Sequence, residues 1–289
     1  MMVVFNPIAG RRRAPLLWRV LDTMIANGMR LELAETTSRG HAEKLARSAA
    51  VAGERLVVAA GGDGTIAEVA NGLMGFNAKL GVIPLGTANV LAHELALPFA
   101  PRAIAAALAF GRTRALWPGL ATGPATARLF VQMLGLGFDA EVVRRLSPQL
   151  KLLFGRAAYV WQTLRELPRY PFQSIRLRID GDETEVASAI VTKGRLYGGQ
   201  YLLAPDARPG EPGLSVVLFK QGGPFAALRC GAALPLNRLP GMPGIQQRRA
   251  MRVEILGEHR VPAQVDGDPA GFSPLTVTDA AAPIQVVAG

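Results

Sequence analysis

Gly61-Gly62-Asp63-Gly64-Thr65-Ile66-Ala67-Glu68 is the stretch of sequence from which the fold of this chain can be worked out. It follows the apolar run Leu56–Ala60, which has the length and composition of a strand buried in a parallel sheet. Thr65 and Glu68 have the spacing of a capping box, so we expect a helix to begin there. A strand, a glycine turn and a helix N-terminus direct backbone N–H groups and a helix dipole at one point. Such a point attracts phosphate.

Asp63 is the informative residue of this turn, because a carboxylate repels phosphate unless a cation or a hydrogen-bond donor lies between them. A nucleotide loaded with Mg²⁺ supplies the cation, and the carboxylate can also hold a donor on the ligand. The alternative is that Asp63 merely caps the turn, as Asp often does. The local sequence leaves both interpretations open.

Two familiar phosphate-binding motifs do not explain the turn. The sequence has no G-x-x-x-x-G-K-[ST], which excludes a Walker-type P-loop. Residues 62–67 match G-x-G-x-x-A, but the dinucleotide fingerprint also requires an acidic residue about 20 positions later, at the end of the next strand. The next predicted strand, Leu80–Ile83, is followed by Pro84-Leu85-Gly86, with no carboxylate.

Length and composition predict a two-domain globular protein. The 289 residues are long enough for two cores, and with 49% hydrophobic and 19% charged residues the chain is not disordered. The single cysteine, Cys230, excludes a disulfide framework and favours a reducing compartment. We expect Cys230 to be a small hydrophobic residue of the core.

The charge and the hydropathy indicate where the protein acts. A net charge of +10 favours an anionic partner, such as a nucleotide, a nucleic acid or an acidic membrane surface. The opening residues Met1–Pro7 do not form a signal peptide, and the sequence contains no uninterrupted apolar stretch of about 18 residues. We therefore expect a cytoplasmic protein, soluble or peripheral at the inner face of the membrane.

The N-terminal part alternates strands and helices. Strands are expected at residues 3–5, 31–36, 56–60 and 80–85, and a helix follows each of them. Four such units in a row predict a parallel sheet covered by helices on both faces, and a helix at 101–112 closes this part. In such sheets ligands bind beyond the C-terminal ends of the strands. The turns at residues 6–13, 36–40, 61–65 and 86–89 all lie at that edge.

The pattern changes near Trp117, and strands of alternating character follow. They are expected at 129–134, 175–179, 186–191, 214–219, 253–256, 261–265 and 284–287. This predicts an antiparallel β domain, a sandwich or flattened barrel, with a hairpin turn at Asp180-Gly181. We place the nucleotide-binding domain at 1–118 and the β-rich domain at 119–289, with a helical insertion at about 140–169. The basic face of this insertion either contacts an anionic bilayer or is simply solvated.

Six motifs together resemble the diacylglycerol kinase catalytic-domain family, which includes sphingosine kinases and bacterial lipid kinases. The first three are Asn6-Pro7-Ile8-Ala9-Gly10, Gly61–Thr65 with Glu68 and Asn71-Gly72, and Pro84-Leu85-Gly86-Thr87-Ala88-Asn89. The others are Gly135-Leu136-Gly137-Phe138-Asp139, Tyr197-Gly198-Gly199 with Ala204-Pro205-Asp206-Ala207, and Val265-Asp266-Gly267-Asp268. They occur in this order over nearly the whole chain.

The resemblance implies a Rossmann-like nucleotide-binding domain, a C-terminal β-sandwich domain for the lipid, and a cleft between them in which a lipid hydroxyl attacks the γ-phosphate of ATP. It implies that Asp63 binds Mg²⁺ or orients the nucleotide, and that Asp268 is the general base. Arg11, Arg12 and Arg13 are close enough in sequence to assist with the phosphates. The nucleotide-binding residues that it implies are Asn6, Thr36, Gly61, Gly62, Asp63, Gly64, Thr65, Glu68, Gly86, Thr87 and Asn89.

The sequence departs from the family pattern at two places. The late motif usually ends in Glu, and here it ends in Asp268, which is one methylene shorter. In bacterial members an Asp-Asp-Gly after the Ala-Pro-Asp-Ala segment helps to hold a structural Mg²⁺, and here the segment reads Gly210-Glu211-Pro212-Gly213. The side chain of Pro212 cannot bind a metal. Glu211, or a backbone carbonyl such as that of Leu214, is then the remaining candidate ligand.

We therefore predict an ATP- and Mg²⁺-dependent kinase that phosphorylates a hydroxyl of a diacylglycerol-like lipid, with a role in phospholipid metabolism. The alternatives are an NAD kinase, which also carries the GGDG turn, and a nucleotide-binding regulator with weakened catalysis. We expect peripheral contact with an anionic membrane and no specific nucleic-acid partner, although the charge leaves non-specific DNA binding as a minor alternative. The sequence leaves open whether the protein forms a homodimer.

Overall fold

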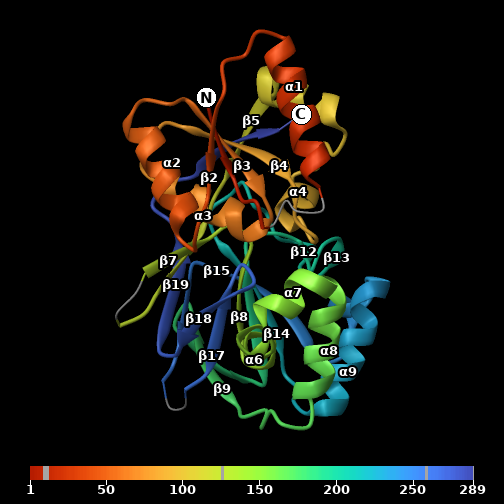
Figure 1. Ribbon diagram of the computed structural model, residues 1–289. Helices are drawn as coiled ribbons and strands as arrows, with labels where there is room; N and C mark the ends of the chain where they lie inside the picture. The colour runs from red at the N-terminus through yellow and green to blue at the C-terminus, as the bar shows by residue number, and fades with distance from the viewer. Residues whose placement is uncertain (9–12, 125–126, 258–259, 289) are drawn as a thin grey trace. The chain divides into compact units, whose positions relative to one another are not determined.

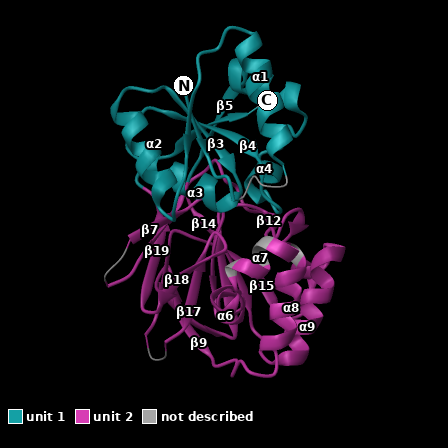
Figure 2. Ribbon diagram, viewed as in Figure 1, with its two compact units in different colours: residues 1–117, 281–289 teal, residues 118–280 magenta. Residues whose placement is uncertain are grey.

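The computed structural model describes residues 1–8, 13–124, 127–257 and 260–288 (Figure 1). Ala9, Gly10, Arg11 and Arg12 of the first predicted loop lie outside the described residues. The chain divides into two compact units, coloured separately in Figure 2. Unit 1 comprises Met1–Trp117 and Ala281–Gly289, and unit 2 comprises Pro118–Ala280.

Unit 1 is built on a largely parallel sheet, as predicted for the N-terminal part, and the sheet has six strands where four were expected. The strand order is β2-β1-β3-β4-β20-β5. All neighbours pair in parallel except β5, which is antiparallel to β20. The strands are β1 (Met2–Phe5), β2 (Glu32–Glu35), β3 (Leu56–Gly61), β4 (Lys79–Pro84), β5 (Arg112–Leu116) and β20 (Ile284–Ala288).

Helices cover this sheet, and they begin and end close to the predicted positions. One core cluster joins Val3, Val58 and Ile83 of the sheet to apolar residues of the first and fifth helices. The second and third helices pack against each other, and a side chain at Gly72 would lie 2.4 Å from the carbonyl oxygen of Glu43. The helices are α1 (Ala14–Ala26), α2 (His41–Val51), α3 (Asp63–Leu73), α4 (Val90–Glu94) and α5 (Pro101–Phe110).

The C-terminal strand lies in a different sheet from the one expected. Residues 284–287 were assigned to the β-rich domain, but β20 pairs with β4 and β5 in the sheet of unit 1. Its residues Val286, Val287 and Ala288 are buried in succession. A strand buried on both faces is typical of the interior of a parallel sheet, whereas a sandwich strand alternates buried and exposed residues. The chain therefore returns to unit 1 at its end.

Unit 2 is an antiparallel β-sandwich, as predicted. One sheet has the order β10-β9-β16-β19-β6-β7 and the other β15-β14-β11-β8-β17-β18. Residues that alternate along strands of both sheets form one shared core, for example Leu134 and Leu136 of one sheet and Ile175 and Leu177 of the other. The first sheet contains β6 (Gly119–Thr122), β7 (Ala127–Phe130), β9 (Ile175–Ile179), β10 (Asp182–Val186), β16 (Arg252–Ile255) and β19 (Leu275–Asp279). The second contains β8 (Met133–Leu136), β11 (Ser188–Thr192), β14 (Leu214–Phe219), β15 (Ile245–Ala250), β17 (Pro262–Val265) and β18 (Asp268–Phe272).

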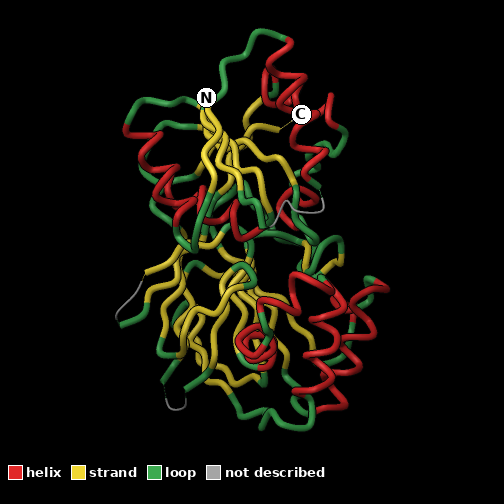
Figure 3. The backbone as a smooth tube through the Cα atoms, in the orientation of Figure 1, coloured by secondary structure: helices red, strands yellow, loops and turns green. Residues whose placement is uncertain are grey.

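Helices and short strands complete unit 2 (Figure 3). The helical insertion expected at about 140–169 consists of α6 (Phe138–Arg145), α7 (Pro148–Phe154) and α8 (Arg156–Glu166), while α9 (Pro224–Ala233) was not predicted. The short strands β12 (Leu196–Tyr197) and β13 (Tyr201–Leu202) pair with each other. A second cluster of buried residues, which includes Ile190 and Val217, packs against the partly buried Cys230 of α9. Burial raises the pKa of the Cys230 thiol.

Candidate functional site

In unit 1 the first two glycines of the turn are closely packed. The helix begins at Asp63 rather than at Thr65, and its N-cap residue is Gly62. A Cβ at Gly61 would lie 2.5 Å from Thr65 Oγ1, and one at Gly62 would lie 3.3 Å from the Cα of Gly86. The first intrahelical bond runs from Ile66 N to Gly62 O, so the amides of the preceding residues form the N-terminal end of the helix dipole.

The predicted capping box does not form. The Glu68 carboxylate instead accepts hydrogen bonds from the backbone N–H groups of Gly40 (2.9 Å) and Ala42 (3.2 Å), at the N-terminus of α2. A carboxylate is stabilised at a helix N-terminus, and α2 provides one where its own N-cap residue, Gly40, has no side chain. Glu68 therefore fixes the loop after β2 against α3.

The side chains of Asn6 and Thr65 are in contact, as expected for loops at the same edge of a parallel sheet. Asn6 Nδ2 donates to Thr65 Oγ1 at 3.1 Å, and Asn6 Oδ1 accepts from Ile8 N at 3.1 Å. Thr36 follows β2, and its N–H donates to the carbonyl of Phe5 at 2.8 Å. The loops after β1, β2 and β3 are thus joined at one edge of the sheet.

The turn after β4 lies against the glycine turn. A Cβ at Gly86 would lie only 2.5 Å from the Cα of Gly62, so the two backbones are in contact. Asn89 has a positive φ of 47° and donates from Nδ2 to the carbonyl of Gly86 at 2.8 Å. Its Oδ1 is buried and accepts no hydrogen bond from any described residue. Thr87, in the same turn, is exposed.

Asp63 connects these two turns. Leu91 N, at the start of α4, donates to Asp63 Oδ1 at 3.3 Å. Burial raises the pKa of Asp63, and hydrogen bonds from the backbone of residues 89–91 oppose that rise. The carboxylate therefore has a structural contact with the N-terminus of α4.

In unit 2, Asp268 begins β18 and is partly buried. Its Oδ2 lies 3.4 Å from Nη2 of Arg128, and its side chain is 17% exposed. Asp266, two residues earlier, accepts backbone hydrogen bonds from Val131 (2.8 Å), Gln132 (2.9 Å) and Met133 (2.9 Å). Burial raises the pKa of Asp266 to about 6, against the effect of these three amides. These bonds also explain why the single strand expected at 129–134 is divided into β7 and β8.

A hydrogen-bonded network supports this hairpin. Tyr197 and Gln264 donate to the two carboxylate oxygens of Asp139, Gln264 Nε2 at 3.0 Å. Gln264 Oε1 in turn accepts from the N–H of Gly267 at 2.8 Å. A Cβ at Gly135 would lie 2.1 Å from Asp139 Oδ2, which explains the glycine. Three of the motifs noted in the sequence thus meet in unit 2.

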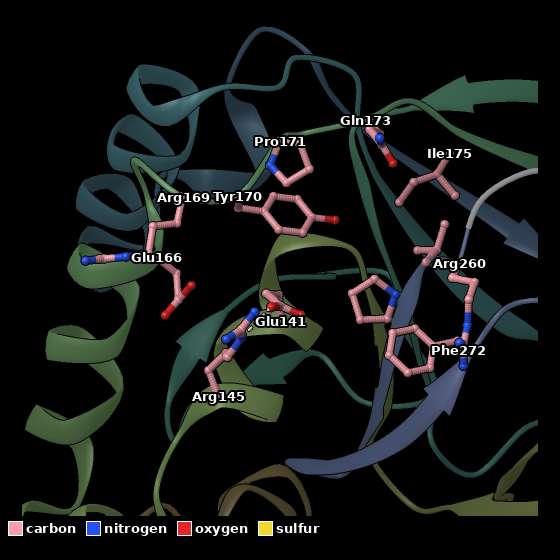
Figure 4. A pocket seen from close by; sticks show the side chains of 12 residues that line it. Glu141, Arg145, Glu166, Arg169, Tyr170, Pro171, Gln173, Ile175, Arg260 and Phe272 are labelled. Carbon is pink, nitrogen blue, oxygen red and sulfur yellow. Dashed lines mark hydrogen bonds and ion pairs between the residues drawn. The ribbon is translucent and has the colours of Figure 1, made fainter.

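Unit 2 also contains a polar hollow of about 210 Å³ that the sequence did not indicate (Figure 4). Glu141 accepts from Arg144 and Arg145, at 2.7 and 2.8 Å, and these contacts lower its pKa. Burial raises the pKa of Tyr170 to about 12. The hollow is lined by Glu141, Arg145, Glu166, Arg169, Tyr170, Pro171, Gln173, Ile175, Arg260, Val261, Pro262 and Phe272.

The segment at which the family pattern has a structural metal is bound by basic side chains in this chain. Glu211 Oε2 lies 3.2 Å from Arg208 Nη1 and 3.6 Å from Arg249 Nη2. Leu214 is the first residue of β14 and pairs with Ala250. Within the described residues, no three or more His, Cys, Asp or Glu side chains form a group that could hold a metal ion.

Comparison with known protein families agrees with the division of the chain into an N-terminal parallel-sheet part and a C-terminal β-sandwich part. Residues 1–119 match the model of the diacylglycerol kinase catalytic domain, and residues 132–288 match that of the YegS C-terminal NAD kinase beta sandwich-like domain. The chain belongs to the diacylglycerol kinase and YegS-like lipid kinase family. This lipid kinase family includes a diacylglycerol kinase of Bacillus subtilis, 28% identical over 94% of this chain and 90% of that protein. It also includes a probable YegS-like lipid kinase of Pseudomonas putida, 32% identical over 84% of this chain and 80% of that protein.

Solved structures support the fold of this lipid kinase. The crystal structure of a putative diacylglycerol kinase from Bacillus anthracis matches with a TM-score of 0.82, covering 100% of this chain and 94% of that chain at 20% identity. Among the helices that the described residues form, none combines the length and apolarity needed to cross a bilayer.

Proposed function

We propose that this lipid kinase transfers the γ-phosphate of ATP to the hydroxyl of a diacylglycerol-like lipid. The observation that carries the proposal is the contact between two glycine turns at the N-terminus of α3, within a chain of this family. A helix N-terminus without side chains lets phosphate oxygens approach backbone N–H groups closely. Gly61, Gly62, Gly64 and Thr65 form the centre of this phosphate site, and Gly86 and Thr87 form its second wall.

Further polar groups at the same sheet edge extend the nucleotide site. Asn6 and Thr65 are hydrogen-bonded to each other, and Thr36 lies at the end of the neighbouring strand. Glu68 acts indirectly, since its carboxylate is bound to the N-terminus of α2. It holds the loop that carries residues 36–40 and so positions Thr36.

The donor set fits a magnesium nucleotide. Asp63 presents a carboxylate, and the buried Oδ1 of Asn89 accepts no hydrogen bond from the described residues. Oxygen atoms of this kind are the ligands that Mg²⁺ takes, directly or through water. Mg²⁺, when bound, supplies positive charge that offsets the charge on the phosphoryl oxygens.

Asp268 is the proposed general base. A lipid alcohol is a poor nucleophile, and a positioned carboxylate that accepts its proton contributes about 10²–10⁴-fold. The N–H of Gly267, the residue before Asp268, is held by Gln264 and, through it, by Asp139 and Tyr197. Arg128 lies 3.4 Å from the carboxylate and orients it. Asp268 is one methylene shorter than the Glu of the family pattern, so its reach depends on the position of its backbone. The hydrogen bond from Gly267 to Gln264 and the contact with Arg128 fix that position.

The helices of unit 2 provide a surface for a membrane-embedded substrate. Leu153 and Phe154 of α7 and Val160, Trp161 and Leu164 of α8 are each more than half exposed. The exposed Arg165 and Arg169 lie at the end of α8 and just beyond it. Apolar side chains beside arginines are typical of helices that lie in an anionic membrane interface.

A transfer assay tests the proposed activity. The full chain is incubated with γ-labelled ATP and Mg²⁺, with mixed diacylglycerol-containing vesicles, with NAD, and without an acceptor. Label in the organic extract is the expected result. Label on NAD would instead identify an NAD kinase, and nucleotide binding without any transfer would identify a regulator, so either result would overturn the proposal.

Sedimentation with vesicles tests the membrane surface separately. Wild-type protein is expected to bind vesicles that contain phosphatidylglycerol and to bind phosphatidylcholine vesicles weakly. Trp161→Glu should reduce the bound fraction at least several-fold, because a charged side chain replaces an apolar one that would be buried in the membrane interface. A matched substitution of the exposed Phe110 on α5 should leave binding unchanged. Equal binding by both variants would remove α8 from this role.

A further inference from the structure

The segment that the family pattern assigns to a structural Mg²⁺ holds a side-chain cation of the protein itself. Lys193 follows β11, and its side chain is fully buried, with 0% of its area exposed. Its Nζ donates to the carbonyl of Gly213 at 2.6 Å, to the carbonyl of Glu211 at 3.2 Å and to Asp279 Oδ1 at 2.6 Å. Two backbone carbonyls and a carboxylate form a set of oxygen atoms that attracts a hard cation.

The hydrogen-bond partners of Lys193 match the donors of its charged form. A lysine ammonium has three donors and no acceptor, and here there are three acceptors, one for each donor. A neutral amine would leave one of these acceptors without a donor. Burial lowers the pKa of Lys193, and the contact with Asp279 opposes that shift.

Asp279 closes the same arrangement from the other side. This residue ends β19, and its second oxygen, Oδ2, accepts the N–H of Gly213. One carboxylate thus binds both the ammonium and the backbone of the 208–214 segment. Gly213 has a φ of +100°, which permits its N–H and its carbonyl to face this pair together.

A second basic side chain binds the outer side of the segment. Arg249 Nη2, from β15, donates to the carbonyl of Pro212 at 2.6 Å and lies 3.6 Å from Glu211. A divalent ion would have to enter beside the Lys193 ammonium and near this guanidinium, and it would need six oxygen ligands at about 2.0–2.1 Å. The residues present do not fit that requirement.

We propose that the Lys193 ammonium is the structural cation of the 208–214 segment, so that this segment is ordered without a divalent metal. The departure from the family's Asp-Asp-Gly at Glu211-Pro212 then has a physical reason. A charge built into the chain replaces one that would otherwise have to be bound from solution. The inference concerns the folded state of unit 2 and does not rest on the proposed transfer reaction.

Hydrogen exchange and thermal unfolding of the full chain without nucleotide test this inference. For the wild type, we expect the exchange of amides in residues 208–214, including Gly213, to be the same in millimolar Mg²⁺ and in EDTA. Faster exchange of this segment in EDTA would overturn the proposal. This measurement needs no variant, so it holds even if a substitution prevents folding.

Lys193→Met supplies the second measurement, because it keeps an unbranched side chain that is only one atom shorter and removes the charge and the donors. Breaking a buried ion pair of this kind should lower Tm by roughly 10 °C and speed exchange in residues 208–214. Lys220→Met is the matched control. Lys220 donates to Thr184 Oγ1 and to the carbonyl of Glu185 in a more exposed place, so its loss should lower Tm by about 2 °C or less and leave the segment unaffected. A Lys193→Met protein with wild-type exchange in this segment would refute the inference.

Discussion

The hairpins β9–β10 and β17–β18 turn through the same tripeptide, Asp-Gly-Asp, at residues 180–182 and 266–268. In both turns the first Asp and the Gly have positive φ, 48° and 100° in one and 49° and 82° in the other. These are the angles of a two-residue type I′ turn, for which Asp-Gly is a preferred pair. Identical local sequence thus gives identical local backbone.

The two turns even use their first Asp in the same way. Asp180 accepts from the backbone N–H groups of Met251 and Arg252, where β16, the strand beside its hairpin, begins. Asp266 accepts from three successive amides, at residues 131–133, beside its own. In each case a turn carboxylate satisfies backbone donors at a place where the neighbouring strand begins or is interrupted.

The surroundings of the third residue separate the turns. Asp182 is exposed, whereas Asp268 is 17% exposed, lies near Arg128 and follows a glycine whose N–H is held by Gln264. The second hairpin is attached to the network of Asp139 and Tyr197. The tripeptide specifies the turn, and the packing around it decides whether the last carboxylate can serve a reaction.

The largest expected effect comes from substituting the third residue of the β17–β18 turn, with the same substitution in the β9–β10 turn as the control. Asp268→Asn should lower kcat for lipid phosphorylation about 100-fold with little change in nucleotide affinity, because only the proton acceptor is lost. Asp182→Asn should leave kcat unchanged. Steady-state kinetics with labelled ATP and fluorescent-nucleotide titration measure both quantities. If Asp268→Asn retained the wild-type rate, Asp268 would lose its assignment as the base.

A smaller effect is expected at Asp63, which resembles the turn carboxylates in binding backbone amides of another element. If it also handles the nucleotide, Asp63→Asn should lower turnover at least tenfold and weaken binding of Mg²⁺-ATP. If it serves only as a cap for α4, the variant should lose stability while its rate at a permissive temperature stays normal. Measuring kcat and Tm on the same preparation distinguishes the two, and an unchanged kcat would remove Asp63 from the reaction.

The sequence predicted the architecture well where local periodicity and topology agree. The run Leu56–Ala60 and the glycines after it predicted a strand and a helix in unit 1, and the rule that ligands gather at the C-terminal edge placed Asn6 beside Thr65. The strand 284–287 was assigned to the wrong domain because its partners, β4 and β5, are about 200 and 170 residues away in sequence. Nothing in a short apolar segment encodes a partner so distant.

The side-chain contacts of the sites were harder to predict for the same reason. Glu68 has the spacing of a capping box, yet it binds the N-terminus of α2, 26 to 28 residues earlier. Lys193 gave no signal at all, because its partners Glu211, Gly213 and Asp279 come from two other segments. Spacing along one element identifies neighbours on that element, whereas a buried polar side chain finds its partners through the whole fold.

The last expected effect is on stability and concerns the first residues of the two turns. The folded state holds the proton of Asp266 up to a pH of about 6, whereas an unfolded chain releases it near 3.8. The folded state therefore binds more protons between these values, so the stability contributed by Asp266 is complete below the lower value and is lost as pH rises through about 6. Because one pKa unit corresponds to about 1.4 kcal/mol, the free energy of unfolding should decline by about 3 kcal/mol across this window because of Asp266. Urea unfolding from pH 4 to pH 7 measures the slope of the unfolding free energy against pH.

Asp266→Asn should flatten this slope, and Asp180→Asn, which leaves the titrating group in place, should not. A slope that survived in Asp266→Asn would mean that other groups set the pH dependence, and the two turns would then differ only in their third residue.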